Sequence, residues 1–176
     1  MEVKEVKSLI EALLFVSGEP LSAADLKTAT EIPEADIRQI LGDMITEYRE
    51  KDMGLLILEI AGGYQMVTNP SYAQWIRKFR NTSTSNKLSA PALETLAIIA
   101  YNQPLIKAEI EQIRGVGADG VIKTLLDKRL IKIMGRKEVP GKPLLYGTTR
   151  EFLQYFGLKD LTDLPTLKEL AREEAA

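Results

Sequence analysis

The sequence predicts a helix-rich α+β fold made of two tandem copies of one small module, and three observations lead to this prediction. The chain has 176 residues, of which 45% are hydrophobic and 27% charged, which suits one or two small domains with ordinary cores. A run without apolar side chains, NTSTSNK at 81–87, divides the chain near its middle. The segments on either side of that run share one ordered pattern.

The repeat is visible in the residues themselves. EALLFVSGEPLSAADL in the first half corresponds to ETLAIIAYNQPLIKAEI in the second, and one inserted residue brings Pro20-Leu21 onto Pro104-Leu105. Further along, SYAQWI at 71–76 matches EFLQYF at 151–156. Each copy is predicted to contain an apolar helix, a turn with proline, a short helix, a longer helix, two strands and a closing aromatic helix.

Three helices followed by a β-hairpin is the plan of the winged helix, a variant of the helix-turn-helix. The predicted organisation is two tandem winged-helix domains. We expect an N-terminal winged helix at 1–80, a linker at 81–88, a C-terminal winged helix at 89–158 and a tail at 159–176.

Apolar periodicity supports the longer helix of each copy. Helical spacing predicts one buried stripe in the first copy, made of Ile37, Ile40, Leu41, Met44, Ile45 and Tyr48. The second copy repeats the stripe over a shorter span, with Val121, Ile122, Leu125 and Leu126. Two strands follow in each copy: 55–60 and 64–68 joined by Gly62-Gly63 as a tight hairpin, then 131–134 and 144–149 flanking a longer loop.

Three glycines, Gly115, Gly117 and Gly120, spell the G-x-G-x-x-G pattern of dinucleotide-binding folds. That pattern must follow a strand directly, whereas here Ile106, Ile110 and Ile113 precede it at helical spacing. We therefore expect Gly115 to end the second helix of this copy and the next residues to turn into the third.

The composition argues against an enzyme. Cysteine and histidine are absent, which excludes disulfides and removes the usual zinc ligands and the commonest general base. No convincing set of acid, base and nucleophile is found, so no catalytic, cofactor-binding or metal-binding residue is predicted. A signal peptide and a membrane span are not expected, because acidic residues interrupt the first helix and LAIIAY at 96–101 is the longest apolar run. A cytoplasmic location follows.

Charge separates the two copies. Residues 1–80 carry 9 Lys and Arg against 13 Asp and Glu, whereas residues 81–157 carry 11 against 7. The longer helix of the first copy, within 33–52, has a net charge of −3 and would meet phosphate repulsion in a DNA groove. The second copy allows weak, salt-sensitive DNA phosphate contacts as a secondary hypothesis, or else a solvated basic face, through Lys123, Lys128, Arg129, Arg136, Lys137 and Lys142.

Several uncommon stretches of the second copy occur in series: LETLAIIAYNQP at 93–104, EIEQIRGVGADGVIKTLL at 109–126, LIKIMGRKEVPGKPLLYGTT at 130–149 and FLQYFGLKDLTDLP at 152–165. They resemble the segregation and condensation protein B family of bacteria, and IEALLFVSGEPLS continues the resemblance through the first half.

The resemblance implies a non-enzymatic accessory subunit of the bacterial condensin-like complex, which acts in chromosome condensation and segregation at the nucleoid. Such proteins form homodimers, largely through their first winged helix. They bind the kleisin subunit, segregation and condensation protein A, which bridges the ATPase heads of the structural-maintenance-of-chromosomes protein. The family brings no catalytic residue and no cofactor.

Residues 55–60 offer an independent reason to expect self-association. Leu56, Leu58 and Ile60 fill one face of this strand, while Leu55 and Ile57 make the other face apolar as well. We therefore expect the second apolar face to be buried as well, by self-association. The alternative is that the closing helix around Trp75 covers the hairpin. The residues predicted at the dimer interface are Leu55, Ile57, Tyr64, Met66 and Trp75.

Aromatic side chains and arginine are enriched where protein interfaces are anchored. On this ground we predict kleisin contacts for Tyr101, Arg114 and Tyr146, with the kleisin lying in a groove as an amphipathic helix or extended segment. The alternative function is a winged-helix transcriptional regulator that reads a palindromic operator, which would need the basic recognition helix that the first copy lacks.

Overall fold

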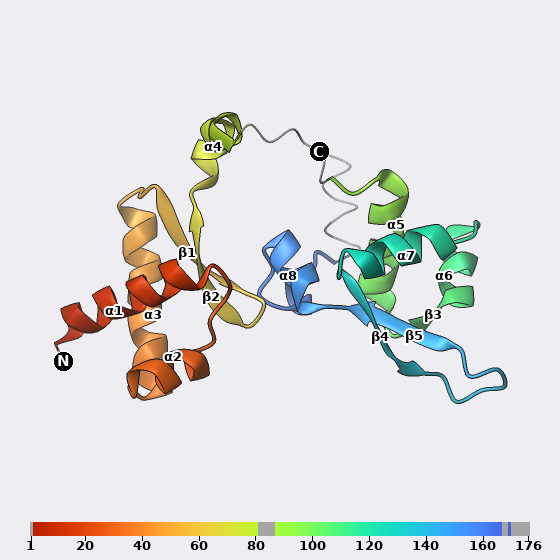
Figure 1. The fold of residues 1–176 in the computed structure, drawn as a ribbon, viewed down its shortest axis with the longest axis horizontal. Coiled ribbons are helices and arrows are strands. Elements are labelled where there is room, and N and C mark those ends of the chain that lie inside the picture. The colour runs from red at the N-terminus through yellow and green to blue at the C-terminus, as the bar shows by residue number, and fades with distance from the viewer. Residues whose placement is uncertain (1, 81–86, 167–168, 170–176) are drawn as a thin grey trace. The chain divides into compact units, whose positions relative to one another are not determined.

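The computed structural model describes residues 2–80, 87–166 and 169 (Figure 1). The chain divides into two compact units, the first formed by Met1–Ser83 with Gly157–Ala176 and the second by Thr84–Phe156. The expected linker lies mostly outside the described residues, as does most of the expected tail beyond residue 166. Each unit is described by itself.

The first unit contains the predicted elements in the predicted order. They are α1 (Val3–Ser17), α2 (Ala23–Thr30), α3 (Glu34–Glu50), β1 (Leu55–Ile60), β2 (Gly63–Thr68), a short 3-10 turn η1 (Pro70–Tyr72) and α4 (Ala73–Arg80). The helix-rich winged-helix fold is thereby confirmed for this unit.

The core of the first unit forms where the stripe of α3 meets α1, α2 and the hairpin. Ile37, Leu41 and Met44 are buried, and the other three members of the predicted stripe pack partly buried against them. Burial of each such side chain stabilises the unit by ~1.5–3 kcal/mol relative to its exposure.

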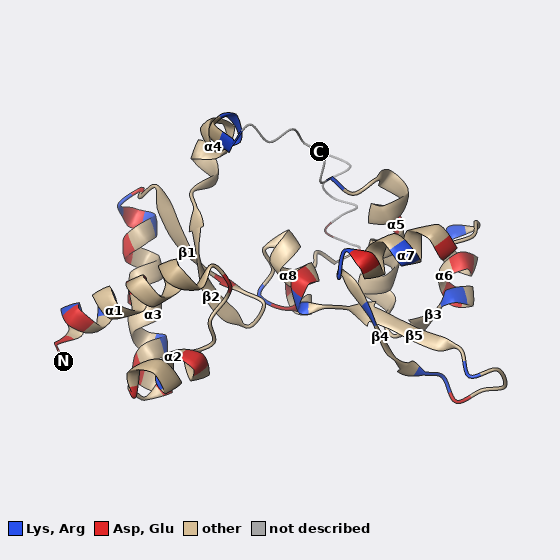
Figure 2. Cartoon of the chain, in the orientation of Figure 1, with Lys and Arg blue, Asp and Glu red and all other residues tan. Residues whose placement is uncertain are grey.

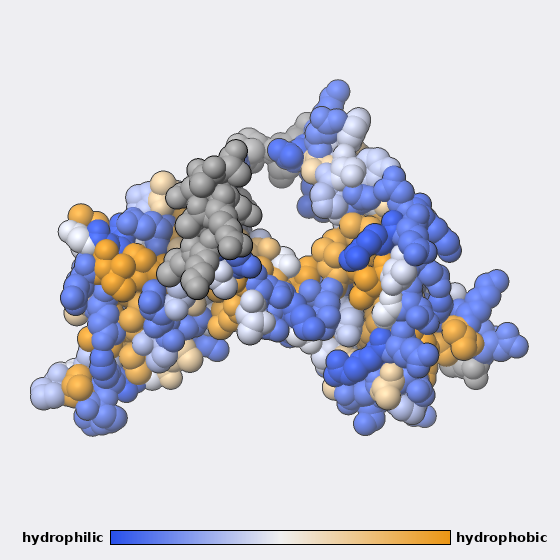
Figure 3. Space-filling model, turned by 180° about the vertical axis from the view of Figure 1, so that it is seen from behind, coloured by the Kyte–Doolittle hydropathy of each residue, from blue (hydrophilic) through white to orange (hydrophobic). Residues whose placement is uncertain are grey.

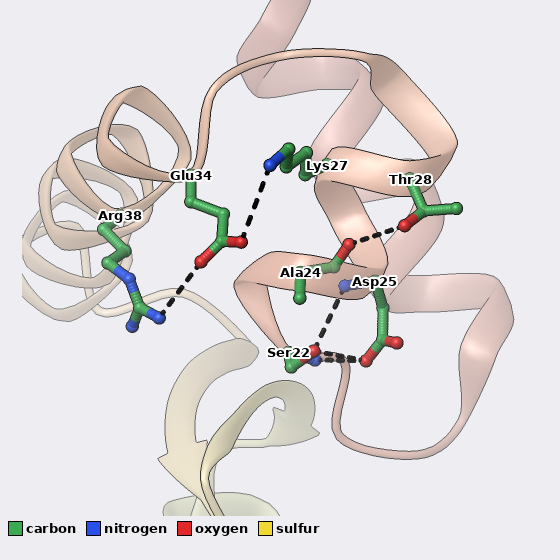
Figure 4. Close-up of polar contacts among 7 residues, drawn as sticks. All are labelled: Ser22, Ala24, Asp25, Lys27, Thr28, Glu34 and Arg38. Atoms are coloured by element: carbon green, nitrogen blue, oxygen red, sulfur yellow. Dashed lines mark hydrogen bonds and ion pairs between the residues drawn. The ribbon is translucent and has the colours of Figure 1, made fainter.

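Local polar contacts fix where α2 begins. The Ser22 hydroxyl accepts a hydrogen bond from the Asp25 backbone N–H at 3.1 Å, and the Asp25 carboxylate accepts one from the Ser22 backbone N–H at 2.8 Å (Figure 4). This capping box satisfies donors that the first turn of a helix otherwise leaves unpaired. Glu34, at the start of α3, pairs with Lys27 and Arg38 and so joins the two helices (Figure 4).

The hairpin differs from the expectation in its turn. The residues with positive φ are Ala61 (52°) and Gly62 (71°), not Gly62 and Gly63. Gly63 is instead the first residue of β2, and a Cβ there would lie 2.9 Å from the backbone carbonyl of Leu21. A close backbone approach, rather than the turn, therefore explains this glycine.

The second unit repeats the plan, with one strand more than predicted. Its elements are α5 (Ala90–Asn102), β3 (Leu105–Ile106), α6 (Lys107–Arg114), α7 (Asp119–Asp127), β4 (Ile131–Arg136), β5 (Leu144–Thr148) and α8 (Arg150–Phe156). Gly115 caps α6 at φ 74°, as expected, and α7 begins four residues later. Gly115 and Gly117 lie in a helix-to-helix turn, and Gly120 is already within α7.

The extra strand shows how closely the two units correspond. In the second unit the sheet order is β3-β5-β4, and Leu105 pairs with Tyr146. In the first unit Leu21 makes an isolated bridge to Tyr64 at the equivalent place. The two leucines are those that the repeat aligned, each directly after a proline. The repeat therefore extends to this contact, which is a strand in the second unit and an isolated bridge in the first.

The segment after α8 packs with the first unit. The backbone N–H groups of Ala61 and Gly62 donate hydrogen bonds to the carbonyls of Leu158 and Lys159, at 2.8 and 3.0 Å. The Lys159 ammonium lies 3.2 Å from the Glu59 carboxylate. These contacts belong to residues that the sequence left in the second domain or in a separate tail.

Candidate protein-interaction surfaces

The face of the hairpin that carries Leu55 and Ile57 turns toward the helices of the first unit. Ile57 pairs with Met66, and Glu59 with Tyr64, so these side chains share one face. Ile57 and Tyr64 are 1% and 8% exposed and belong to the core. Two of the five residues predicted at the dimer interface are thus core residues, because a strand with two apolar faces does not reveal which face its own helices cover.

The open end of that face forms a shallow groove against α1. The groove has a volume of about 480 Å³ and is lined by Ser8, Glu11, Ala12, Phe15, Leu55 and Met66. The α1 members lie on one side of the helix, opposite the buried Val6, Ile10 and Leu14. Leu55 and Met66, predicted from the sequence at an interface, therefore line an accessible apolar groove.

The helix α4 does not cover the hairpin, contrary to the alternative reading of Trp75. None of its side chains is buried, and Trp75 and Phe79 are 59% and 88% exposed. Figure 1 shows α4 standing away from α1, α2 and α3 beyond the end of β2. Basic residues occupy its last turn, and it contains no acidic residue (Figure 2).

Acidic side chains dominate the rest of the first unit. On α3, Glu47 forms an ion pair with Lys7 of α1, and the Lys7 ammonium holds the pKa of that carboxyl below its usual range. Burial, followed by interaction with the Glu11 carboxylate, raises the pKa of Tyr48 to about 12. Glu11 thus lies between the core at Tyr48 and the groove beside α1.

In the second unit, Arg114 is a structural residue. Its side chain is only 5% exposed, although its Nη2 approaches the Glu94 carboxylate at 3.4 Å. Its Nη1 donates a hydrogen bond to the Gly117 carbonyl at 2.9 Å, which holds the turn between α6 and α7. The buried Nε has no hydrogen-bond partner. The residue leaves little surface for a kleisin contact.

The other two predicted kleisin residues differ in accessibility. Tyr146 is buried in β5, whereas Tyr101 at the end of α5 is 39% exposed. Other large apolar side chains are exposed nearby in the sequence, namely Leu93 on α5, Ile113 on α6 and Val116 in the following turn. Seen from behind, both units have apolar side chains gathered at the surface (Figure 3). Sequence reasoning missed Leu93 and Ile113 because their helical spacing resembles that of core residues.

The six basic residues proposed for phosphate contacts fall into two groups. In the wing, the loop between β4 and β5 with the ends of these strands, the Lys137 ammonium lies 2.6 Å from Glu109 and that of Lys142 lies 3.9 Å from Glu138. The Arg136 guanidinium donates a hydrogen bond to the Lys142 carbonyl. Lys123 in the middle of α7, and Lys128 and Arg129 just after it, form no ion pair within the described part of the chain. Two of the three wing cations, Lys137 and Lys142, thus have a carboxylate partner, whereas the three at α7 have none among the described residues.

Two further features limit the chemistry of the described residues. Across residues 2–80, 87–166 and 169, no three or more Asp or Glu side chains gather in a way that could hold a metal ion. None of the helices described there is both long and apolar enough to span a membrane.

Comparison with known proteins gives a consistent result. Residues 8–167 match the model of a family described as segregation and condensation complex subunit ScpB. The chain belongs to this family. It is 49% identical to segregation and condensation protein B of Syntrophotalea carbinolica over 169 residues, which cover 96% of this chain and 85% of the relative.

Solved structures of the family were found as well. The crystal structure of ScpB from Mycobacterium tuberculosis matches with a TM-score of 0.45 and 34% identity, over 90% of this chain and 98% of that chain. A dimer of a ScpB N-terminal domain complexed with a ScpA peptide matches with a TM-score of 0.42 and 24% identity, over 44% and 96%. The family match spans the helices and strands of both units from α2 to η2 (Leu161–Asp163).

Proposed function

We propose that the chain is a non-enzymatic, homodimeric subunit of the bacterial condensin-like complex. In this proposal it binds the kleisin, which bridges the ATPase heads of the structural-maintenance-of-chromosomes protein, and contributes to chromosome condensation and segregation. A cytoplasmic, nucleoid-associated location belongs to the same proposal. The observation that carries it is family membership across residues 8–167.

The surfaces of the first unit support the homodimer. The groove between α1 and the hairpin and the uncovered aromatic side chains of α4 are apolar surfaces within one unit. Uncovered apolar patches of this kind mark protein interfaces more often than isolated exposed residues do. The acidic α3 argues against a DNA-reading role for the same unit, because phosphate contacts require positive charge.

The second unit supplies the surface proposed for the kleisin. Tyr101, Leu93, Ile113 and Val116 are exposed, and they come from α5, α6 and the turn after α6. An amphipathic helix of the kleisin would cover such side chains with its own apolar face. Arg114 and Tyr146 support this surface from below: Arg114 fixes the α6–α7 turn, and Tyr146 pairs with Leu105 in the sheet.

Co-purification tests the proposal directly. The full chain, of 19.6 kDa, is mixed with segregation and condensation protein A and its mass is measured alone and in the complex. We expect a dimer alone and a complex that contains the kleisin. Tyr101→Ala should weaken kleisin capture, whereas Tyr155→Ala on α8, another exposed tyrosine, is the matched control. A monomer that fails to bind the kleisin would overturn the proposal.

A second candidate activity is weak, sequence-indifferent DNA contact through the second unit. It is favoured by Lys123, Lys128 and Arg129, which form no ion pair among the described residues. Arg129 also lines a shallow pocket together with Lys132, Arg150 and Glu151. Binding that neutralises phosphates must weaken as salt rises, by a factor set by the number of contacts. A gel shift at low salt with Lys123→Gln and Lys128→Gln tests this, and binding that is absent or independent of salt removes the candidate.

A further inference from the structure

The helix α4 presents an apolar stripe that its own unit does not cover. Trp75, Ile76 and Phe79 lie on one face of α4, and Tyr72, the last residue of the preceding turn η1, continues their spacing of i, i+3, i+4 and i+7. Ile76 is half-buried, whereas the three aromatic side chains are exposed, Phe79 at 88%. Isolated helices shorter than ~12–15 residues are marginal in water. An eight-residue helix with this face uncovered therefore needs a partner surface.

The same helix is the basic part of an acidic unit. Arg77, Lys78 and Arg80 form no ion pair among the described residues, and no Asp or Glu occurs between Glu59 and Glu94. Residues 1–72, by contrast, carry 6 Lys and Arg against 13 Asp and Glu. The helix and the rest of the unit are therefore complementary in charge, which favours an acidic docking surface for α4.

A surface of that kind exists on the first unit itself. The groove between α1 and the hairpin has apolar walls, made by Ala12, Phe15, Leu55 and Met66, and the Glu11 carboxylate belongs to its lining. An aromatic stripe flanked by cations matches apolar walls beside a carboxylate in both polarity and charge.

The turn that leads into α4 is held in place by Asn69. Asn69, which is 7% exposed, precedes η1 and ties it to the loop before β1. Its side-chain amide donates to the Met53 carbonyl at 3.1 Å, its Oδ1 accepts from the Ser71 N–H at 3.0 Å, and its N–H donates to the Gly54 carbonyl at 3.0 Å. The helix leaves this anchor and stands apart from α1 (Figure 1). The groove that can receive it is that of another copy.

We propose that α4 is an exchanged arm, whose Tyr72–Phe79 face seats in the α1–hairpin groove of a second copy of this chain. The inference rests on the homodimer proposed above and names the contact that forms it. Exchange places the same pair of surfaces twice about a two-fold axis, which closes the assembly at two copies.

The buried area is sufficient for a stable dimer. A fully exposed aromatic side chain can bury ~150–250 Å². Tyr72, Trp75 and Phe79 are 42%, 59% and 88% exposed, so two arms offer roughly 570–950 Å². The two grooves add a comparable surface. The sum reaches the ~1,200–2,000 Å² that specific protein interfaces bury.

Cross-linking tests the contact, and the absence of cysteine makes it specific. One preparation carries Ala12→Cys in the groove and a second carries Phe79→Cys on the arm, both at exposed positions of the full chain. Mixing the two and adding a short bismaleimide should give a covalent dimer that links residue 12 of one copy to residue 79 of the other. Cross-links at Tyr155→Cys, on the exposed face of α8, serve as the control and should not form with Ala12→Cys.

Mass measurement separates the two levels of the proposal. Phe79→Asp and Ala12→Arg should each lower the measured mass from about twice 19.6 kDa toward 19.6 kDa, while the helix content stays unchanged. The control variant Tyr155→Asp should keep the mass of the dimer. A chain that stays dimeric with Phe79→Asp and gives no link from 12 to 79 overturns the arm but keeps the homodimer. A native chain that is monomeric overturns both, and protection of Phe79→Cys by the kleisin alone assigns the arm to that partner instead.

Discussion

Leu21 and Tyr64 exchange two backbone hydrogen bonds, of 2.9 and 2.8 Å, which tie the turn after α1 to the hairpin of the first unit. The adjacent Gly63 permits this approach, because any Cβ there would meet the Leu21 backbone at 2.9 Å. The equivalent pair in the second unit is Leu105 with Tyr146. The same strand-like contact thus anchors the wing of both repeats.

The first prediction concerns that contact. Gly63→Ala should destabilise the first unit by ~1–3 kcal/mol, because the added methyl group must displace backbone rather than a flexible side chain. Gly42→Ala on α3 is the matched control: a Cβ there meets nothing within 4 Å, and replacing a mid-helix glycine should stabilise by ~0.5–1 kcal/mol. Urea unfolding of the full chain, followed by circular dichroism and fitted for two units, measures both. Equal stability of the two variants would contradict the prediction.

The second prediction concerns Gln103, which joins the end of α5 to β5. Its Oε1 accepts a hydrogen bond from the Thr148 N–H at 2.7 Å, and its Nε2 donates to the Thr148 hydroxyl at 2.9 Å. Gln103→Ala should destabilise the second unit by ~1–3 kcal/mol, since a buried N–H loses its acceptor. Asn102→Ala, which removes an exposed bond to the Ile98 carbonyl, should change stability by less than ~0.5 kcal/mol. Hydrogen exchange at Thr148 gives a second readout, and unchanged protection there would refute the assignment.

A third prediction separates a structural arginine from a binding one. Arg114→Lys should destabilise the second unit by ~1–3 kcal/mol, because a lysine cannot keep both the bond to Gly117 and the approach to Glu94 from a buried position. Kleisin affinity, measured well below the unfolding transition, should change little. Lys123→Ala, at an exposed residue without an ion pair, is the stability control. Arg114→Lys that leaves stability intact but abolishes kleisin binding would restore Arg114 to the interface.

The fourth prediction concerns alkaline pH. The pKa of Tyr48 is raised from 10.0 to about 12 by burial and then by Glu11, so the folded chain favours the protonated phenol. Its contribution to stability is complete below pH 10 and is lost as pH rises to about 12. The free energy of unfolding should therefore fall more steeply across that window in the native chain than in Tyr48→Phe. Comparing the native chain with Tyr48→Phe removes the effect of lysines, which titrate in both chains. If the free energy of unfolding fell equally with pH in the two chains, the raised pKa of Tyr48 would be wrong.

The repeat and the helical stripes could be predicted because they depend on local spacing. Apolar residues at intervals of three and four define the buried side of α3 wherever the neighbouring elements lie, and glycine ends α6 for reasons of backbone conformation alone. The hairpin turn was less accessible to prediction. Two adjacent glycines fit a tight turn, but Gly63 is required by the closeness of Leu21, 42 residues earlier in the chain.

The residues of the candidate surfaces could likewise be predicted only in part. Of the residues predicted at the dimer interface, Trp75 is exposed and Leu55 and Met66 are half-buried in the lining of a groove, whereas Ile57 and Tyr64 are buried. Arg114, predicted to contact the kleisin, holds a turn. Apolar alternation in a strand indicates two apolar faces without saying which one the helices cover. An arginine in a sequence likewise carries no sign of whether its guanidinium faces solvent.

By itself the sequence determined the two repeats, the order of their elements, the α6–α7 turn and the family, since each rests on residue spacing and identity along the chain. Only the tertiary structure decided which face of β1 is inner, that Arg114 is buried, and that α4 leaves its aromatic stripe uncovered. Burial is set by which residues distant in sequence pack together, and side-chain spacing within one element does not specify that packing.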